Sequence, residues 1–313
     1  MGNNPKYTIA IPAFKGKYLK DCIKSVLEQT YEDYELIIVN DCSPDPIEEI
    51  VVAISDKRIQ YYKNDLNEGA EHVVNNWNRC LSLAKGEYFV LLGDDDFMDA
   101  NYLAEFDMLI STFPHLDVYH CRSKIVDQEG KVKELTSPWP SFENVYDNIY
   151  YRLNMSRVHF ISDFVYRTAS LKNRQGFYKL PLAWGSDDIS AFAACANTGI
   201  AHTNKAIFNY RESPDTITRS GNTLLKMEAI SKQKIWLNEF LQSAPKDSEQ
   251  LLMYRKIKEE LPSLILRKKA DLIKNSITNG GIKALNFWLG TAKKYGIPKY
   301  LILRIFLAVK LRH

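Results

Sequence analysis

Cysteine is scarce in this chain, and its pattern argues against two classes of protein. The five cysteines are scattered and odd in number, with no CxxC pair and no spacing that combines cysteine with histidine. Such a pattern is unlike a zinc site or a disulfide scaffold, so we expect reduced thiols in the cytoplasm. The N-terminal stretch MGNNPKYTIAIP has no long apolar segment behind a basic start, and we therefore expect no signal peptide.

The sequence also lacks the local motifs that bind phosphate or metal through one run of residues. It contains no GxxxxGKS/T, no GxGxxG and no HExxH, and its aspartate-rich segment lacks the alternating spacing of a calcium loop. Phosphate recognition would therefore have to come from a metal ion and from donors scattered along the chain.

A net charge of +3 hides two parts of opposite charge. From Gln250 to the C-terminus, 14 Lys and Arg stand against 3 Asp and Glu, which gives this part +11 and leaves −8 for residues 1–249. The acidic and basic parts are therefore expected to meet different partners.

Short apolar runs alternate with amphipathic segments in the first 116 residues. The runs at residues 7–11, 35–39, 58–62 and 88–92 read as strands, and residues 17–29, 47–54, 69–85 and 100–113 read as helices. Strands that are apolar on both faces and alternate with helices predict an α/β fold, with a mainly parallel, Rossmann-like sheet covered by helices.

The remainder of the chain reads differently. A hairpin is expected to turn at Glu129-Gly130. From Thr223 onward the pattern is helical, with breaks expected at Pro245, Pro262, residues 279–280 and residues 296–298. We therefore expect one α/β domain over residues 1–222, divided into halves at 1–116 and 117–222, and a basic helical extension over 223–313.

Polar residues follow each of the four predicted strands, where parallel sheets bind ligands. A lone aspartate there is more often a helix cap or turn residue, which is the simpler interpretation of Asp41 taken alone. The three consecutive aspartates of VLLGDDDFMD repel one another unless a cation neutralises them. Oxygen ligands without Cys or His select Mg²⁺ or Mn²⁺, often together with substrate phosphates. A solvated loop in which Asp96 or Asp99 caps a helix would explain one of the three charges only.

Two long segments resemble family 2 glycosyltransferases. They are IPAFKGKYLKDCIKSVLEQTYEDYELIIVNDCSPD and NEGAEHVVNNWNRCLSLAKGEYFVLLGDDDFMD, within a match from about Tyr7 to Leu103. The resemblance implies the GT-A fold and a nucleotide-diphosphate sugar as donor. It places Asp41 at the base or ribose and Pro12, Ala13 and Phe14 along the nucleotide, and we include Asn67, after the third strand, in this donor site. Lys15 stands where the family frequently has Asn.

The family's metal motif usually reads DxDD before an aromatic residue, and here it reads GDDDF from Gly93. By position, Asp95 resembles the metal-binding aspartate. Asp94 could take a ribose contact or a contact to metal-bound water. Asp96 is the second expected metal ligand, or alternatively a residue that orients the loop. The resemblance thus implies Mn²⁺ or Mg²⁺ as cofactor.

Inverting transfer to a hydroxyl also needs a carboxylate that removes the proton. LAWGSDDISAFAACANTG, residues 182–199, resembles the family's GED segment, in which a glycine follows twelve residues after the Glu. Asp187 takes the Glu position and Asp188 the Asp position, which makes Asp188 the expected base and Asp187 its support. Capping of the helix is a compatible interpretation. Trp184 is expected either to stack on an acceptor sugar or to lie in the core.

Phe208-Asn209-Tyr210-Arg211 resembles the family's YR segment, so Arg211 or Arg219 is expected to face the donor diphosphate, although surface arginines are common. His72, His159 and His202 have no metal spacing and are interpreted as structural.

Apolar and basic residues mix in KKYGIPKYLILRIFLAVKLRH, residues 293–313, which is too short and too charged to span a bilayer. It is expected either to lie on an anionic membrane or to pack on the domain with a solvated basic face. No nucleic-acid recognition motif accompanies it.

The resemblance, supported by the carboxylates at the strand ends, implies a metal-dependent, inverting glycosyltransferase, expected in the cytoplasm or at the inner face of the cell membrane. The expected donor is a UDP-sugar, and the expected acceptor is a glycan, which is lipid-linked if the basic tail lies on a membrane. The alternatives are a sugar-nucleotide or glycan-binding module without turnover and, less well supported, a nucleotidyltransferase.

Overall fold

The N-terminal half of the chain forms the parallel part of a mixed sheet. The computed structural model describes residues 4–213 and 222–311. Four parallel strands lie in the order β3-β2-β1-β4. They are β1 (Tyr7–Ala13), β2 (Tyr34–Asn40), β3 (Ile59–Lys63) and β4 (Tyr88–Leu91). Each strand lies within two residues of its predicted bounds, which confirms the interpretation of the apolar runs.

Side chains of β1 alternate between two apolar layers, as the pleat of a strand requires. Ile9 and Ile11 face one layer, which receives α1, α2 and α4, whereas Ala10 faces the other layer, which receives α3. The helices are α1 (Leu19–Leu27), α2 (Ile47–Val52), α3 (Val73–Leu83), preceded by the 3-10 turn η1 (Ala70–His72), and α4 (Tyr102–Thr112). A sheet covered on both faces is the predicted α/β arrangement.

The second half extends the sheet with strands of both directions, in the order β4-β9-β6-β10-β5. β9 runs antiparallel to β4 and β6, whereas β6 and β10 form a long parallel pair. The strands are β5 (Phe97–Met98), β6 (Val118–Val126), β7 (Val132–Leu135), β8 (Phe142–Glu143), β9 (Phe164–Arg167) and β10 (Ile200–Arg211). The predicted hairpin joins β6 to β7, and Gly130 in its turn has φ +85°.

The described residues of this half also form three helices and two 3-10 turns. They are α5 (Val145–Leu153), α6 (Thr168–Asn173), α7 (Ser186–Cys195), η2 (Ile161–Asp163) and η3 (Pro181–Ala183). α5 and α7 pack on the same face of the sheet as α3. The five cysteines are all free, as the sequence led us to expect.

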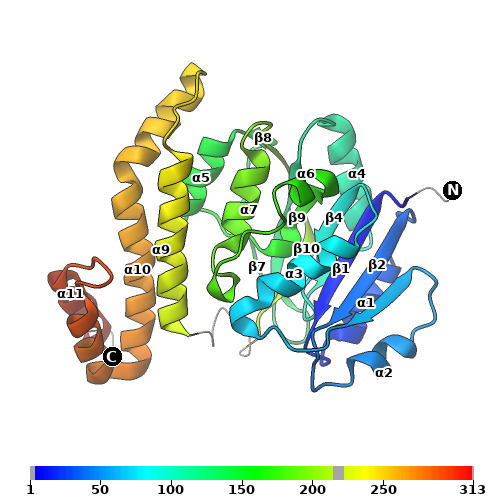
Figure 1. Ribbon diagram of the computed structural model, residues 1–313, viewed down its shortest axis with the longest axis horizontal. Helices are drawn as coiled ribbons and strands as arrows, with labels where there is room; N and C mark the ends of the chain where they lie inside the picture. Colours follow the sequence, from blue (N-terminus) through cyan, green and yellow to red (C-terminus); the bar gives the residue numbers. More distant parts are fainter. Residues whose placement is uncertain (1–3, 214–221, 312–313) are drawn as a thin grey trace.

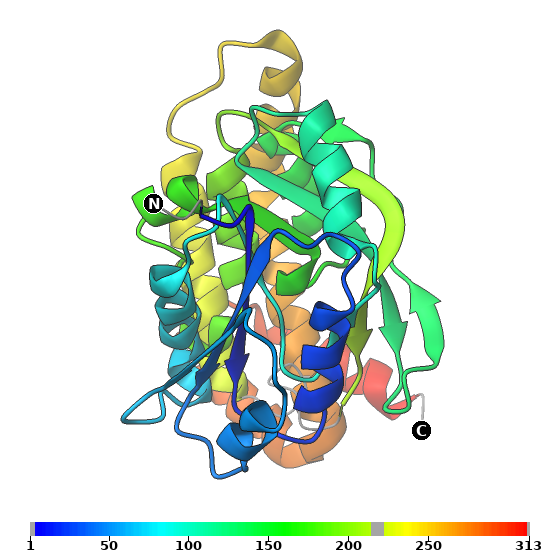
Figure 2. The same ribbon diagram turned by 90° about the vertical axis from the view of Figure 1, so that its right-hand side faces the viewer.

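The C-terminal region consists of α9 (Thr223–Phe240), α10 (Ser248–Thr291) and α11 (Lys299–Lys310). Figures 1 and 2 show α9 and α10 side by side beyond α5 and α7, on the side of the molecule away from α1 and α2. Buried residues of both helices, such as Ile230 and Leu264, join the apolar layer that contains α3, α5 and α7. The basic extension therefore shares a core with the α/β part. Among the described residues, no helix combines the length and the apolar character that crossing a membrane requires.

The break expected at Pro262 was wrong, because α10 continues through this residue. A proline inside a helix costs about 3 kcal/mol. Leu261, Leu264 and Ile265 are buried around it, and each fully buried side chain of this kind contributes about 1.5–3 kcal/mol. Burial therefore outweighs the loss. The break expected near residue 280 is confirmed, since Gly281 has φ +55° and ψ −134° inside the assigned helix.

Candidate active site

The ends of β1 and β4 meet at the edge of the sheet where the strand order switches. Asp94, which follows β4, accepts hydrogen bonds through one carboxylate oxygen from the backbone N–H groups of Phe14 and Lys15, both at 2.7 Å. The convergence predicted for these two strand ends is therefore confirmed. Pro12 and Ala13 belong to β1 itself, and the ring of Phe14 is 42% exposed at this edge.

Gly93, Asp94, Asp95 and Asp96 form what we call the triple-aspartate loop. Its charges are poorly compensated. Burial and the neighbouring Asp95 raise the pKa of Asp94 to about 6. Burial, and then Asp95, also hold the pKa of Asp96 well above its usual range. The Lys15 ammonium lies 3.2 Å from Asp95, whose side chain is 15% exposed.

Arg211 fixes this loop from β10. Its backbone N–H donates to Asp96 at 2.8 Å, and its guanidinium donates to the carbonyl of Asp95 at 2.9 Å and to that of Gln128 at 2.6 Å. The same guanidinium lies over the ring of Tyr18. Arg211 was predicted to face a donor diphosphate, and the structure places it against the loop that would hold the metal. Arg219 lies outside the described residues.

Gly93 has a steric reason to be glycine. A Cβ added there would lie 2.8 Å from a carboxylate oxygen of Asp96, closer than side chains pack. Its N–H donates to Ser162 at 3.2 Å and its carbonyl accepts from the Cys22 thiol at 3.3 Å, so the backbone is held on both sides. The glycine that replaces the first carboxylate of the family motif thus makes room for the third aspartate.

The donor set of the loop fits a divalent cation on charge and ligand type. Three carboxylates stand close together, with the Lys15 ammonium beside Asp95 and the Arg211 guanidinium at the Asp95 carbonyl, and carboxylate oxygens are the ligands of Mg²⁺ and Mn²⁺. Among the described residues, another group, His159 with Asp187 and Asp188, has ligand atoms within 4.8 Å of one another. That group already contacts Arg152 and Lys268, whose positive charges oppose a cation.

Asp41, after β2, organises the loop that follows β3. Its carboxylate accepts from the amide of Asn64 at 2.7 Å and from that of Asn67 at 3.1 Å, and the Asn67 amide also donates to the Asp41 carbonyl at 2.6 Å. The N–H of Glu68 completes the set at 3.2 Å. Burial raises the pKa of Asp41, although these hydrogen bonds oppose the shift. Asp41 and Asn67, which were both predicted for the donor site, therefore contact each other directly.

Asp187 and Asp188, which we call the carboxylate pair, lie in the first turn of α7 after Gly185, whose φ is +89°. Asp188 is 1% exposed, and both of its oxygens are occupied. One oxygen accepts from Arg152 at 2.5 Å and lies 3.1 Å from His159; the other accepts from Gln233 at 2.9 Å and Lys268 at 3.1 Å. Asp188 is thus bound by groups from three helices, α5, α9 and α10, and from the segment before η2.

The cations around Asp188 favour its ionised form. Burial alone would raise the pKa of Asp188, but Arg152, Lys268 and His159 outweigh burial and hold the pKa well below its usual range. Burial likewise disfavours the charged form of His159, yet the two carboxylates raise its pKa overall. Asp187 has a 19% exposed side chain and, among the described residues, contacts His159 alone, at 3.4 Å.

A cavity of about 500 Å³ joins the two acidic groups, and we call it the central cavity. Its lining includes Asp96 from the triple-aspartate loop, the carboxylate pair from α7, Trp184 before α7, and Lys268 from α10. Its volume lies within the usual range of ligand sites. Residues separated by more than 170 positions thus face one space, which can hold a ligand between the two groups.

Four residues of this site escaped the sequence analysis: Arg152, His159, Gln233 and Lys268. His159 had been interpreted as structural, and that interpretation was incomplete because the histidine contacts both members of the carboxylate pair. Up to 80 positions separate these residues from Asp188, and no local spacing signals the contacts. A buried carboxylate needs cationic partners, and this rule was the one available hint.

The sequence matches the profile of glycosyl transferase family 2 over residues 8–179. One similar relative is the "Putative colanic acid biosynthesis glycosyl transferase WcaA" of Escherichia coli strain K12, 36% identical over 140 residues, or 42% of this chain and 49% of the relative. The glycosyltransferase GlyG of Streptococcus pneumoniae is 33% identical over 99 residues, or 31% of this chain and 32% of the relative. The matches therefore span about half or less of these relatives' own length.

Solved structures extend the likeness over the whole chain at the level of fold. TarS of S. aureus, solved in complex with UDP-GlcNAc, superposes with a TM-score of 0.65 at 18% identity, covering 97% of this chain and 90% of that one. The mannosyltransferase PcManGT of Pyrobaculum calidifontis, in complex with GDP-Man and Mn²⁺, gives 0.55 at 15% identity, covering 99% and 87%. The predicted GT-A type of fold is confirmed. Because the family profile spans more than half of the sequence, the chain belongs to glycosyl transferase family 2.

Proposed function

We propose that this chain is an inverting glycosyltransferase that moves a sugar from a nucleotide diphosphate to a hydroxyl of a glycan acceptor, in the synthesis of a surface polysaccharide. The observation that carries the proposal is the central cavity, which is lined by Asp96 on one side and by the carboxylate pair on the other. A UDP-sugar is our choice of donor, and the UDP-GlcNAc complex of TarS supports it. The similarity to WcaA supports the polysaccharide context.

The donor side of the proposal uses the triple-aspartate loop. Asp95 and Asp96 would hold a divalent cation, Mn²⁺ or Mg²⁺, which neutralises the donor diphosphate and improves the nucleotide as a leaving group. Asp94 keeps the loop against the end of β1 through Phe14 and Lys15, and Arg211 keeps it against β10. Phe14, Asp41 and Asn67 are assigned to the nucleotide by their place at the strand ends.

The acceptor side of the proposal uses the carboxylate pair. The acceptor hydroxyl attacks the anomeric carbon and forms the new bond to oxygen, the bond from that carbon to the diphosphate breaks, and a carboxylate takes the hydroxyl proton. Position in the family motif assigns this role to Asp188. Geometry favours Asp187, because three donors already occupy Asp188 and His159 lies beside it, whereas Asp187 lines the cavity with a 19% exposed side chain 3.4 Å from His159. We therefore propose Asp187 as the base and Asp188 as the residue that positions it.

The experiment is a turnover assay with a panel of UDP-, GDP- and dTDP-sugars in Mn²⁺, with release of nucleotide diphosphate as the readout. Asp95→Ala should abolish cation-dependent nucleotide binding, and Asp187→Asn should remove turnover while leaving nucleotide binding intact. Asp65→Asn, on the exposed loop after β3, is the matched control. Turnover that survives Asp187→Asn but not a folded Asp188→Asn would return the role of base to Asp188. Nucleotide binding without turnover would instead indicate a binding module, and no nucleotide binding would refute the proposal.

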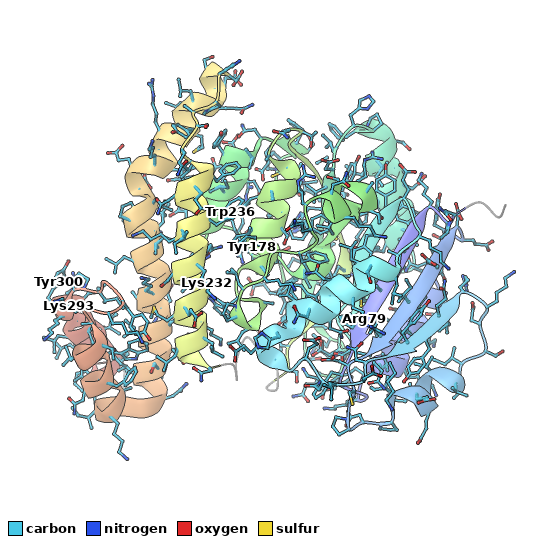
Figure 3. All side chains as sticks on the ribbon, viewed as in Figure 1. Arg79, Tyr178, Lys232, Trp236, Lys293 and Tyr300 are labelled. Carbon is cyan, nitrogen blue, oxygen red and sulfur yellow. The ribbon has the colours of Figure 1, made fainter. Side chains whose placement is uncertain are left out.

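We further propose that the acceptor is lipid-linked and that α11 contacts an anionic membrane at the cytoplasmic face. One side of α11 packs on the molecule through Ile302, whereas Tyr300, Leu303, Leu307 and Leu311 are between 45% and 87% exposed. Lys299, Arg304 and Lys310 lie on the same helix. Figure 3 shows Lys293 and Tyr300 on the outer side of this region, away from the sheet. Each basic residue near an anionic surface contributes about 1 kcal/mol.

Sedimentation with vesicles tests this contact. The protein should pellet with vesicles that contain phosphatidylglycerol and not with pure phosphatidylcholine, and Leu303→Ser combined with Leu307→Ser should weaken pelleting. Val52→Ser, at an even more exposed apolar residue on the far side of the sheet, is the control. Equal pelleting of both variants would remove the membrane role of α11.

A further inference from the structure

A second cavity adjoins the central cavity and is larger, at about 890 Å³. We call it the outer cavity. It lies between α9, α10 and the segments around Met155 and Trp184. Trp184 and Lys268 line both cavities, so the two spaces meet at these side chains. One of these shared residues, Lys268, also donates to Asp188 of the carboxylate pair.

The wall that α10 contributes is polar in a regular pattern. Asp271, Asn275 and Asn279 line the cavity at a spacing of four residues, which places them on one face of the helix, and Ser276 lines it beside Asn275. Ser276 is fixed by the indole N–H of Trp288, which donates to it at 3.0 Å. A row of carboxylate, amide and hydroxyl groups offers both donors and acceptors along about two turns.

Apolar surface completes the lining and gives it an amphipathic character. Ile230 from α9 and Leu272 from α10 face the cavity, as does the indole of Trp184, over which Lys226 lies at 4.6 Å. Small residues at the far end, Gly280 and Ala284, leave the space open. Rows of polar groups beside aliphatic and aromatic surface match a sugar chain, whose hydroxyls form hydrogen bonds and whose C–H faces pack on apolar groups.

We propose that the outer cavity is a subsite for the inner sugar units of an oligosaccharide acceptor, whose terminal unit reaches the carboxylate pair in the central cavity. This inference rests on the proposed function and extends it, because it makes the acceptor longer than one sugar. Its volume lies near the upper end of the range for ligand pockets, and it shares the side chains of Trp184 and Lys268 with the central cavity. Lys268 stands at the junction, where it also donates to Asp188 and Gln233.

An array of bacterial surface oligosaccharides, printed beside the single-unit glycosides of the same sugars, tests the subsite without knowledge of the donor. The wild-type protein should retain at least one oligosaccharide about tenfold more tightly than its terminal unit alone. Asn275→Ala combined with Asn279→Ala should remove that advantage, and Ala284→Phe, which fills the cavity, should do the same. Lys274→Ala combined with Thr278→Ala, at exposed positions on the same stretch of α10 outside the lining, is the matched control.

The outcomes separate this inference from the function on which it rests. UDP and GDP binding, measured on the same preparations by calorimetry, should be the same in wild type and in all three variants. The subsite would be overturned if wild type bound oligosaccharides no better than single units, or if the two cavity variants bound them as well as wild type does. Intact nucleotide binding would in that case leave the proposed function in place. If the wild-type protein bound neither UDP nor GDP, the proposed function itself would be refuted.

Discussion

The triple-aspartate loop and the carboxylate pair border one cavity, but their surroundings differ. Backbone N–H groups of Phe14, Lys15 and Arg211 bind the aspartates of the loop. The Lys15 ammonium lies beside Asp95, and the Arg211 guanidinium binds a backbone carbonyl rather than a carboxylate. Side-chain cations bind the carboxylate pair. The pKa values follow: those of Asp94 and Asp96 are raised and that of Asp188 is lowered.

This difference indicates which of the two acidic groups would bind a cation. The loop has more negative charge than its surroundings compensate, so a cation lowers its energy. Asp188 is already compensated and stays ionised, so its surroundings stabilise a fixed geometry and resist a further cation. Two acidic clusters of similar composition are thus suited to different tasks, one to metal and one to position.

The largest expected effect comes from breaking the pair. Asp188→Asn leaves Arg152, Lys268 and His159 without their buried counter-charge, and removing one partner of a buried ion pair typically costs about 3–5 kcal/mol. Urea denaturation should show a loss of this size. Asp187→Asn, one residue earlier and partly exposed, should cost less than about 1 kcal/mol. Equal losses in the two variants would contradict the contrast between them.

A smaller effect is expected from crowding the loop. Gly93→Ala places a Cβ 2.8 Å from Asp96 and should destabilise the protein by about 1–3 kcal/mol, with weaker Mn²⁺ binding because the carboxylate must move. The measurements are thermal unfolding and a Mn²⁺ titration. Gly290→Ala, where nothing lies within 4 Å, should be neutral or stabilising. An unchanged Mn²⁺ affinity in Gly93→Ala would show that Asp96 is not constrained by Gly93.

The smallest expected effect is a pH dependence of stability caused by Asp163, a third buried carboxylate to compare with the loop and the pair. Burial raises the pKa of Asp163 to about 7, and its partners are hydrogen-bond donors, the Ser123 hydroxyl and the Phe160 N–H. The folded state then holds a proton that the unfolded state has released, so stability falls as pH rises through 7. Between pH 6 and 8 this group should cost about 1.4 kcal/mol.

Denaturation at the two pH values checks this effect. Asp163→Asn should lose less stability than wild type over the interval, whereas Asp65→Asn, at an exposed site, should follow wild type. An identical pH dependence in Asp163→Asn and wild type would place the titration elsewhere.

The sequence predicted the parallel half of the fold well because its signals are local. The run YELIIVN is buried at every position in β2, and the apolar run alone is enough to indicate such a strand. The direction of β9, between β4 and β6, has no comparable signal, because strand order depends on contacts between distant segments. The same limit applies to Pro262, where burial far along the chain overrides a local rule.

The residues of the candidate site likewise fall into those with a local sequence signal and those without one. Asp94, Asp95, Asp187 and Asp188 are recognisable because motif spacing marks them. Gln233 and Lys268, by contrast, lie in helices whose sequences read as ordinary amphipathic segments, and their contacts to Asp188 arise from packing.

The place of Lys268 in the sequence has a consequence for biosynthesis. A chain emerging from the ribosome folds from its N-terminal side, so the parallel sheet and the triple-aspartate loop can form early. Asp188 gains its partner Gln233 only when α9 has been made, and its partner Lys268 only when the first half of α10 has followed. The nascent protein would therefore complete the nucleotide side before the acceptor side, and a ribosome stalled before residue 268 would present an unfinished, charged core to chaperones and proteases.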